Sequence, residues 1–295
     1  MEWVGTLCVV ALLLVGLVAV GVRVPGGELA RLLAARMLCA AALADGCGDE
    51  PGLIAAYGTE VGRLVREHMP MLAFEEGSRA VPVDFRRCRR TACSDRTEHG
   101  EVHRTDAGLP VTAFVHVVDC RAREAKAGGA DCSGSRAGNL YIQYWTYYAD
   151  SATLRDIPVA GEEGFHLDDW EGVQIRIGPD GHVDQRASSH NGYNYGRSAG
   201  NWGSDAGLDL VNQAAEALGV RERNGWDVET GIVLVSGGSH AGNAAGIPHV
   251  DHFIPGRRVH LIPLEPIAVT DASTFAITPP WRKRAWRDPE ADGTD

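Results

Sequence analysis

A short acidic stretch carries the residues of this sequence that are best suited to chemistry. From His166 to Glu171 the chain reads HLDDWE, and the apolar alternation VQIRI follows almost at once. Successive side chains of an extended chain point to opposite faces, so Asp169 and Glu171 share a face with the apolar residues of this segment. If those residues face the core, the two carboxylates lie at its rim, where they repel each other and lose hydration. We therefore expect a compensating group: a shared proton, an arginine or a cation.

A divalent cation would compensate these carboxylates well, because Ca²⁺ and Mg²⁺ take oxygen ligands from carboxylates and water. His166 and Asp168 lie close enough to add a ligand or a supporting hydrogen bond. Asp150 ends the segment NLYIQYWTYYAD and would reach the same end of an adjacent strand. The alternative is structural: Asp168 and Asp169 cap a turn while Glu171 pairs with an arginine, since ion pairs also cluster carboxylates.

The Gly-rich segment GIVLVSGGSHAGNAAGIP is a second candidate, because Ser239 and His240 follow an apolar run. A nucleophile elbow also places a serine after a strand, but it should open a helix, and Gly242, Gly246 and Pro248 argue against one. We favour a loop that presents His240 near the metal.

A Gly/Ser/Asn-rich segment, SSHNGYNYGRSAGNWGSDAG, predicts a long surface loop, and such loops are more often functional than idle. Tyr193, Tyr195 and Trp202 of this loop are expected to close over a ligand of the ion. Aromatic rings at such a site would stack on sugar rings or lie among lipid headgroups.

The cysteines indicate the compartment. Cys88 and Cys93 close one short polar loop, and Cys120 and Cys132 close another, as two local disulfides would. Zinc is a rival interpretation, although neither pair has the spacing of a zinc knuckle. Reduced, unrelated cysteines are the other alternative. We expect two disulfides, and therefore an extracytoplasmic domain.

The first residues are unlike those of a soluble domain. Between Glu2 and Arg23 lie twenty residues without a charge, which is enough to cross a bilayer. A cleaved signal peptide usually has a basic start and a shorter apolar core, so residues 1–23 predict an uncleaved, single-pass membrane anchor; cleavage would make the protein secreted. Arg31 and Arg36 follow Arg23, and the positive-inside rule would place the chain after the anchor in the cytoplasm. This conflicts with the extracytoplasmic location that the predicted disulfides indicate.

The remaining pattern predicts a helical stalk followed by a β domain. Residues 24–68 hold two helical patterns, at 28–44 and 53–69. Beyond them, strand signals dominate in the segments 71–77, 80–85, 111–119, 139–148, 170–178, 183–190, 231–237 and 258–264, with one helix at 206–220. Strands joined by short turns predict a mostly β fold, an antiparallel β-sandwich at 69–290 with a few peripheral helices and a tail at 291–295.

Charge narrows the class of partner. A net charge of −11 argues against nucleic acid, because phosphate binding needs clustered Lys and Arg. The basic run WRKRAWR, Trp281 to Arg287, is flanked by the acidic DPEADGTD and is interpreted as a solvated tail.

The stretch HLDDWEGVQIRIGPDGHVDQRASSHNGY resembles the core of the necrosis-inducing NPP1-like proteins, which carry Gly-His-Arg-His-Asp-Trp-Glu, a strand, and then Ser-x-His-Gly-x-Tyr. It is also similar to the Vps62-related family, with which FEEGSRAVPVDF, SGGSHAGNAAG and TPPWRKRAWRDPE share features over roughly residues 68–290. The start, MEWVGTLCVVALLL, is similar to Flp/Tad-type pilins.

The NPP1-like resemblance implies a β-sandwich and a metal held by Asp150, His166, Asp169 and Glu171, with His190 in the place of the later family histidine. Phe165 and Asp168 stand where that family has glycine and a second histidine, which puts membrane-damaging activity in doubt.

These observations predict a membrane-anchored, extracytoplasmic module that binds Ca²⁺ or Mg²⁺ and, through it, a glycan or a lipid headgroup. A metal-dependent hydrolase is the first alternative, with His190 or His240 as general base. A pilus-associated structural subunit is the second, and it rests on the N-terminal segment.

Overall fold

A computed structural model describes residues 50–98, 102–121, 129–151, 166–189, 192–193, 225–243, 250–265 and 272–291. The chain divides into two compact units, Met1–Leu64 and Val65–Asp295. The predicted membrane anchor, residues 1–23, and the helical pattern at 28–44 lie outside the described residues, as does the helix expected at 206–220. Over the described ranges, no helix has the length and apolar character needed to cross a membrane. The second helical pattern forms α3 (Glu50–Glu67), which is kinked at Gly58, where φ is 78°.

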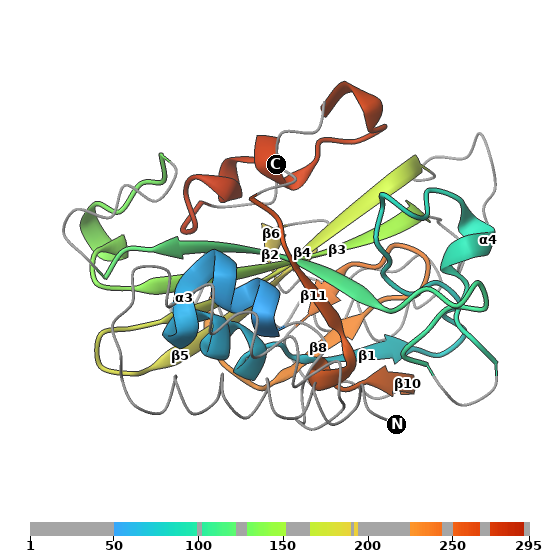
Figure 1. Cartoon of the computed structure of the whole chain (residues 1–295), viewed down its shortest axis with the longest axis horizontal. Helices are drawn as coiled ribbons and strands as arrows, with labels where there is room; N and C mark the ends of the chain where they lie inside the picture. The colour runs from blue at the N-terminus through green and yellow to red at the C-terminus, as the bar shows by residue number, and fades with distance from the viewer. Residues whose placement is uncertain are drawn as a thin grey trace, which may run out of the picture. The chain divides into compact units, whose positions relative to one another are not determined.

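The larger unit is mostly β, with two sheets and few helices, as expected of a β-sandwich (Figure 1). Among the described residues, the smaller sheet has the order β10 (Val250–Ile254), β1 (Met71–Glu75), β8 (Ile232–Val235) and β9 (Gly242–Asn243). The larger sheet has the order β11 (His260–Pro263), β2 (Thr112–Asp119), β3 (Leu140–Ser151), β4 (His166–Ile177), β5 (Val183–Ser189) and β6 (Gly192–Tyr193), and β7 (Asp227–Val228) pairs with β5. The short helices are α4 (Thr91–Ser94) and the 3₁₀ turns Gly134–Arg136, Gly256–Arg258, Ala272–Thr274, Pro280–Arg282 and Arg284–Trp286.

The two longest strands form the centre of the larger sheet. β3 and β4 each have 12 residues and pair antiparallel from Leu140 opposite Ile177 to Ser151 opposite His166. Every residue of β3 is buried, so both of its faces are covered. Such a strand is rich in aromatic and β-branched residues because they fill a pleated, enclosed surface.

The smaller sheet packs against one face of this centre. Tyr148 of β3 stacks on His240, which joins β8 to β9, with ring centroids 3.9 Å apart. Gly242 of β9 allows the close approach, because a Cβ there would lie 2.7 Å from the Cβ of Ala187 in β5. Two pairings, β1 with β8 and β11 with β2, are parallel, which the expectation of an antiparallel sandwich did not include.

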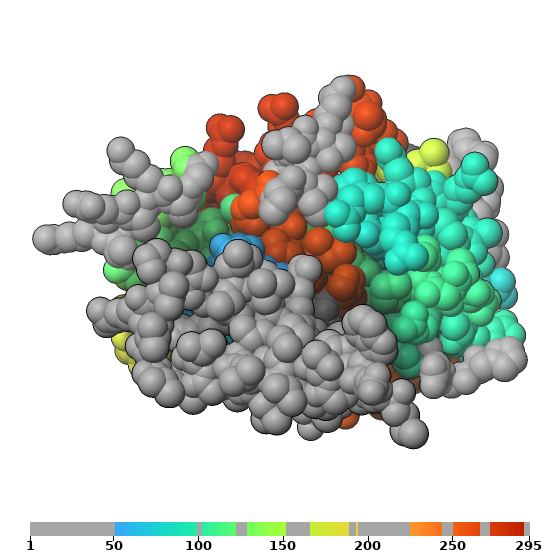
Figure 2. Space-filling model, viewed as in Figure 1, coloured from blue at the N-terminus to red at the C-terminus, as the bar shows by residue number. Residues whose placement is uncertain are grey.

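The other face of the larger sheet is covered by the C-terminal segment, residues 272–291, drawn in red (Figure 1). Its Trp281 is buried, and its main chain accepts hydrogen bonds from sheet residues: Gln143 Nε2 donates to the Ala285 carbonyl at 2.6 Å, and Arg186 to the Pro289 carbonyl at 2.5 Å. The prediction of a solvated tail at 281–287 was therefore wrong, because the apolar residues between the charges pack inward. Figure 2 shows this segment lying against the region around α4.

The strand predicted at 80–85 was also wrong. Ala80 makes an isolated bridge to Asp95, and Val81 and Val83 each donate one backbone hydrogen bond to a different segment. Pro82 has no N–H to donate, so a continuous ladder cannot form across it.

Candidate functional site

The acidic stretch lies at the beginning of β4, where the alternation predicted from the sequence divides its side chains between two faces. Asp169 pairs with Tyr148 and Glu171 with Thr146, on the face toward the smaller sheet. Trp170 points the other way, into an aromatic cluster with Phe275 and other residues of the larger unit. The two carboxylates are thus held on one face by the strand itself.

Within the described residues Asp168, unlike Asp169 and Glu171, has an arginine that neutralises its carboxylate. Its backbone has φ of 59°, a conformation uncommon outside glycine. Arg89 grips the carboxylate with two bonds of 2.9 and 2.6 Å, the Tyr147 hydroxyl donates at 2.6 Å, and the Ala276 amide donates at 2.8 Å. Burial alone would raise its pKa, but these donors together lower it. The arginine partner considered for Glu171 is therefore found on Asp168 instead.

Asp169 is paired with a histidine. Its Oδ2 lies 2.9 Å from Nδ1 of His240, and both side chains are almost fully buried. His240 has φ of 55° and stacks on Tyr148 in nearly parallel planes, 3° apart. Positive φ in a non-glycine residue concentrates at functional sites and costs about 1–3 kcal/mol. The Gly-rich segment thus places the His240 ring beside the acidic stretch, and the prediction that it lies near a metal stays a prediction.

Glu171 lies beside this pair. Ser188 of β5 donates its hydroxyl to Glu171 Oε2 and accepts from the Gly172 amide at 2.6 Å. Burial, and next the neighbouring Asp169 carboxylate, raise the pKa of Glu171 to about 8. Lys283 and His240 act in the opposite direction through their charge. Two carboxylates this close do not both ionise easily, which is the electrostatic strain expected from the sequence.

Asp150 and His166 lie at the same end of the ladder but do not complete a cluster. The Thr91 hydroxyl donates to Asp150, and Nδ1 of His166 lies 3.3 Å from the carbonyl of its own neighbour, Leu167. Within the described ranges, no three His, Cys, Asp or Glu side chains are grouped as metal ligands. The metal roles of these residues therefore stay predictions.

The predicted ligand-binding aromatics are only partly described. Tyr193 is buried, with the Arg186 guanidinium 3.7 Å from its ring centroid and its hydroxyl 3.3 Å from Gln174 Nε2. It is thus enclosed by the protein, and its contact with a ligand stays a prediction. Tyr195 and Trp202 lie outside the described residues, and so does the candidate base His190.

Ser239 does not have the setting of a nucleophile. It lies in the tight turn between β8 and β9, and the chain continues into a strand rather than a helix. A nucleophile elbow requires a strand followed by a helix. This agrees with the sequence interpretation that disfavoured a serine hydrolase.

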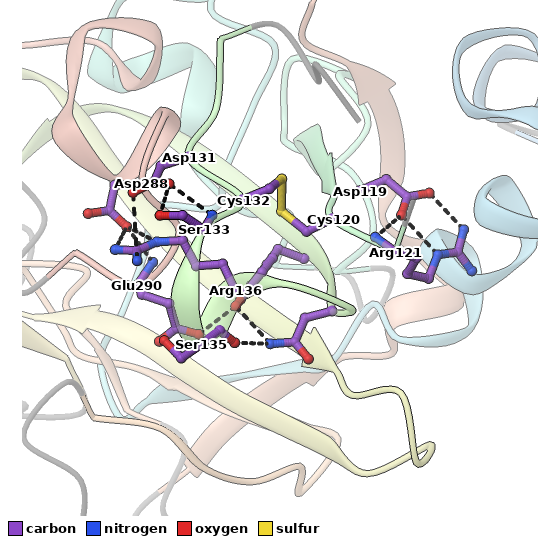
Figure 3. The surroundings of a disulfide bond; sticks show 12 residues. Asp119, Cys120, Arg121, Asp131, Cys132, Ser133, Ser135, Arg136, Asp288 and Glu290 are labelled. Carbon is purple, nitrogen blue, oxygen red and sulfur yellow. Dashed lines mark hydrogen bonds and ion pairs between the residues drawn. A yellow bond between two sulfur atoms is a disulfide. The ribbon is translucent and has the colours of Figure 1, made fainter. Parts of the chain in front are cut away.

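The two disulfides are present as predicted. Cys88 bonds to Cys93, and Cys120 to Cys132. The second holds the loop 129–139 at the end of β2, where Arg136 binds Asp288 of the C-terminal segment (Figure 3). The disulfide therefore fixes a loop that in turn fixes the C-terminal segment.

Sequence reasoning missed Ser188, Arg89 and Lys283, which are the neutral or charged partners of the acidic stretch. Arg89 lies 79 positions from Asp168, so local spacing gave no signal for this pair. Ser188 stood in the quoted motif SSHNGY, and the pairing of β4 with β5 could have pointed to it.

No family model matches this chain, and no curated protein matches it. Among solved structures, it is similar to NLPPya in complex with glucosamine, with 19% identity over 45% of this chain and 51% of that chain, at a TM-score of 0.25. The match thus spans about half of the other chain.

Proposed function

We propose that this chain is a membrane-anchored, extracytoplasmic β-sandwich module that binds a divalent cation through Asp169 and Glu171. Through that ion it would bind a polar ligand such as a glycan or a lipid headgroup. The observation that carries the proposal is the pair of carboxylates on one face of β4, where burial and, next, the neighbouring Asp169 carboxylate raise the pKa of Glu171 to about 8.

The contrast with Asp168 favours a cation over a structural ion pair. Arg89 neutralises Asp168 with a two-bond contact, whereas Asp169 and Glu171 are bonded to a histidine and a serine. A histidine and a hydroxyl compensate two negative charges poorly when both are ionised. A divalent ion would supply the charge that is lacking.

The donor chemistry fits a hard cation with open positions. Two carboxylates are typical protein ligands of Mg²⁺, which keeps several waters, and they form part of the larger shell of Ca²⁺. When bound, the ion would present these positions to ligand hydroxyls or phosphate oxygens. His240 would hold Asp169 in place through their 2.9 Å contact and Ser188 would hold Glu171.

The two disulfides support an extracytoplasmic location, because such bonds persist in oxidising compartments. The membrane anchor in residues 1–23 is part of the proposal and rests on the sequence alone.

The test compares thermal unfolding of the full-length protein in detergent with Ca²⁺, with Mg²⁺ and with EDTA. A cation concentration well above the dissociation constant should raise the melting temperature of the wild type by several degrees. Asp169→Asn combined with Glu171→Gln should reduce this response by the share of this site, and Asp180→Asn, a change in an exposed turn, should keep it in full. An unchanged melting temperature of the wild type in all three solutions would contradict the cation site.

Ligand binding is tested separately on immobilised glycans and on anionic phospholipid vesicles, each with Ca²⁺ and with EDTA. Binding that needs the ion and is lost in the double variant supports the module. Binding that is equal with EDTA would contradict a ligand held by the ion.

A metal-dependent hydrolase is the second candidate, and the Asp169–His240 contact favours it. A carboxylate on Nδ1 fixes the tautomer of a histidine and leaves Nε2 as the basic nitrogen, as general-base catalysis requires. Loss of cation-dependent hydrolysis in His240→Gln, with cation binding retained, would favour this function over a pure binding module.

A further inference from the structure

A second polar site lies beside the turn that carries His240. Residues 236–240 join β8 to β9 and are buried throughout. The turn is closed by two hydrogen bonds of 3.0 Å, from the Ser236 amide to the Ala241 carbonyl and from the His240 amide to the Ser236 carbonyl. Turns are usually exposed, because buried turns need partners for their polar groups. This turn is buried and contains two serines, so its polar groups need hydrogen-bond or ionic partners inside the protein.

The parallel pairing of β1 with β8 places a buried carboxylate beside this turn. Phe74 pairs with Val235, so the next residues along each strand, Glu75 and Ser236, come side by side. Glu75 is 4% exposed, and its Oε2 accepts a 2.8 Å hydrogen bond from the Gly237 amide. A buried carboxylate needs a positive or hydrogen-bonding environment to stay ionised.

Two buried hydroxyls belong to the same segments, Ser78 shortly after β1 and Ser236 directly after β8. Ser78 is 1% exposed and Ser236 is fully buried, and neither Oγ has a hydrogen-bond partner in the described part of the chain. A Cβ placed on Gly237 would lie 3.4 Å from Ser78 Oγ and 3.4 Å from Glu75 Oε2, so both oxygens border the same small space. Buried polar atoms are seldom left without a partner, since each costs about 1–3 kcal/mol.

We propose that this space holds a hard cation of the size of Ca²⁺, bound by the Glu75 carboxylate and the Ser78 hydroxyl, with Ser236 completing the oxygen set. An all-oxygen donor set with one carboxylate suits such an ion, and the acidic chain favours cations generally. The site is separate from Asp169 and Glu171, which lie beyond His240.

The experiment measures Ca²⁺ binding to the full-length protein by calorimetry. The background variant is Asp169→Asn with Glu171→Gln, so that only the second site can bind. One Ca²⁺ per chain should remain in this background, and adding Gly237→Ala should abolish it, because the new methyl group occupies the space of the ion while staying 3.4 Å from both oxygens. No Ca²⁺ binding in the background, or binding that persists with Gly237→Ala, would overturn the proposal.

A second variant guards against misfolding. Ser78→Ala removes one ligand without adding volume and should weaken Ca²⁺ binding at least tenfold, while Ser94→Ala, a change at a buried hydroxyl elsewhere, should leave binding unchanged. Equal affinity in Ser78→Ala and the background would also overturn the site. The outcome separates the two proposals: a wild type that binds one ion, lost with Gly237→Ala but not with the Asp169/Glu171 changes, would retain this site and refute the proposed function.

Discussion

The raised pKa of Glu171 predicts how the stability of the protein depends on pH when divalent cations are absent. The folded state keeps a proton on Glu171 up to about pH 8, whereas the unfolded chain releases it near the ordinary value of 4.5. Between these values the unfolded state binds fewer protons, so the free energy of unfolding falls as pH rises and levels off above about pH 8. Glu171→Gln, which has no charge to lose, should remove this part of the dependence.

The magnitude follows from the same two values. They differ by about 3.5 pH units, and each unit corresponds to about 1.4 kcal/mol of free energy. Glu171 is partly exposed, and solvent screening reduces the effect, so we expect a loss of about 2–4 kcal/mol between pH 5 and pH 8.5.

The assay is urea unfolding at several pH values in EDTA, for wild type, Glu171→Gln and the exposed-site control Glu76→Gln. The free energy of unfolding of the control should fall with rising pH as that of the wild type does. The free energy of unfolding of Glu171→Gln should fall less, so this variant becomes more stable relative to both as pH rises. Parallel pH dependence of Glu171→Gln and the wild type would refute the reasoning, because the carboxylate would then ionise as it does in the unfolded chain.

Three further predictions concern the Arg89–Asp168 ion pair, the anchoring of the C-terminal segment and the Cys120–Cys132 disulfide. Arg89→Met leaves the Asp168 carboxylate buried without the arginine and should lower the free energy of unfolding by about 1–3 kcal/mol, measured by urea unfolding. Adding Asp168→Asn should restore most of this loss. A double variant no more stable than Arg89→Met would contradict the pairing. Arg186→Met removes the donor to the Pro289 carbonyl and should speed proteolysis of the C-terminal segment, and an unchanged cleavage rate would contradict its anchoring role. Replacing Cys120 and Cys132 by serine should lower the free energy of unfolding by about 3 kcal/mol, and an equal stability of the variant and the oxidised wild type would contradict a structural bond.

Local pattern predicted the elements whose signals are contained within a few residues. β2 and β3 are largely apolar over their length and β4 alternates in its second half, and these strands and β5 are found close to their expected bounds. The two disulfides close short loops, which is also information carried by neighbouring residues.

Long-range packing accounts for most of the errors. The C-terminal run around Trp281 is charged along its length, but Trp281 and Ala285 are buried and its carbonyls are bonded to the sheet. The sequence pattern does not show that one face of the larger sheet is covered by this segment. The segment at 80–85 has the apolar content of a strand, but Pro82 interrupts its donors.

In the acidic stretch, too, the local pattern predicts which residues share a face, and long-range packing decides their partners. That Asp169 and Glu171 share a face follows from the period of a strand and is confirmed by the pairing of β4 with β3. The partners Arg89 and Ser188 come from other segments, and only the fold decides that the arginine reaches Asp168.

The central claim is that a cation replaces the proton that burial and the neighbouring Asp169 carboxylate hold on Glu171. Calorimetric titration with Ca²⁺ in two buffers of different ionisation enthalpy tests this claim most directly. With a pKa of about 8, Glu171 is mostly protonated at pH 7, so binding at this site should release close to one proton per ion there and far less at pH 9.5. Glu171→Gln should abolish the release. Ca²⁺ binding without proton release at pH 7, or a release that survives in Glu171→Gln, would contradict the account.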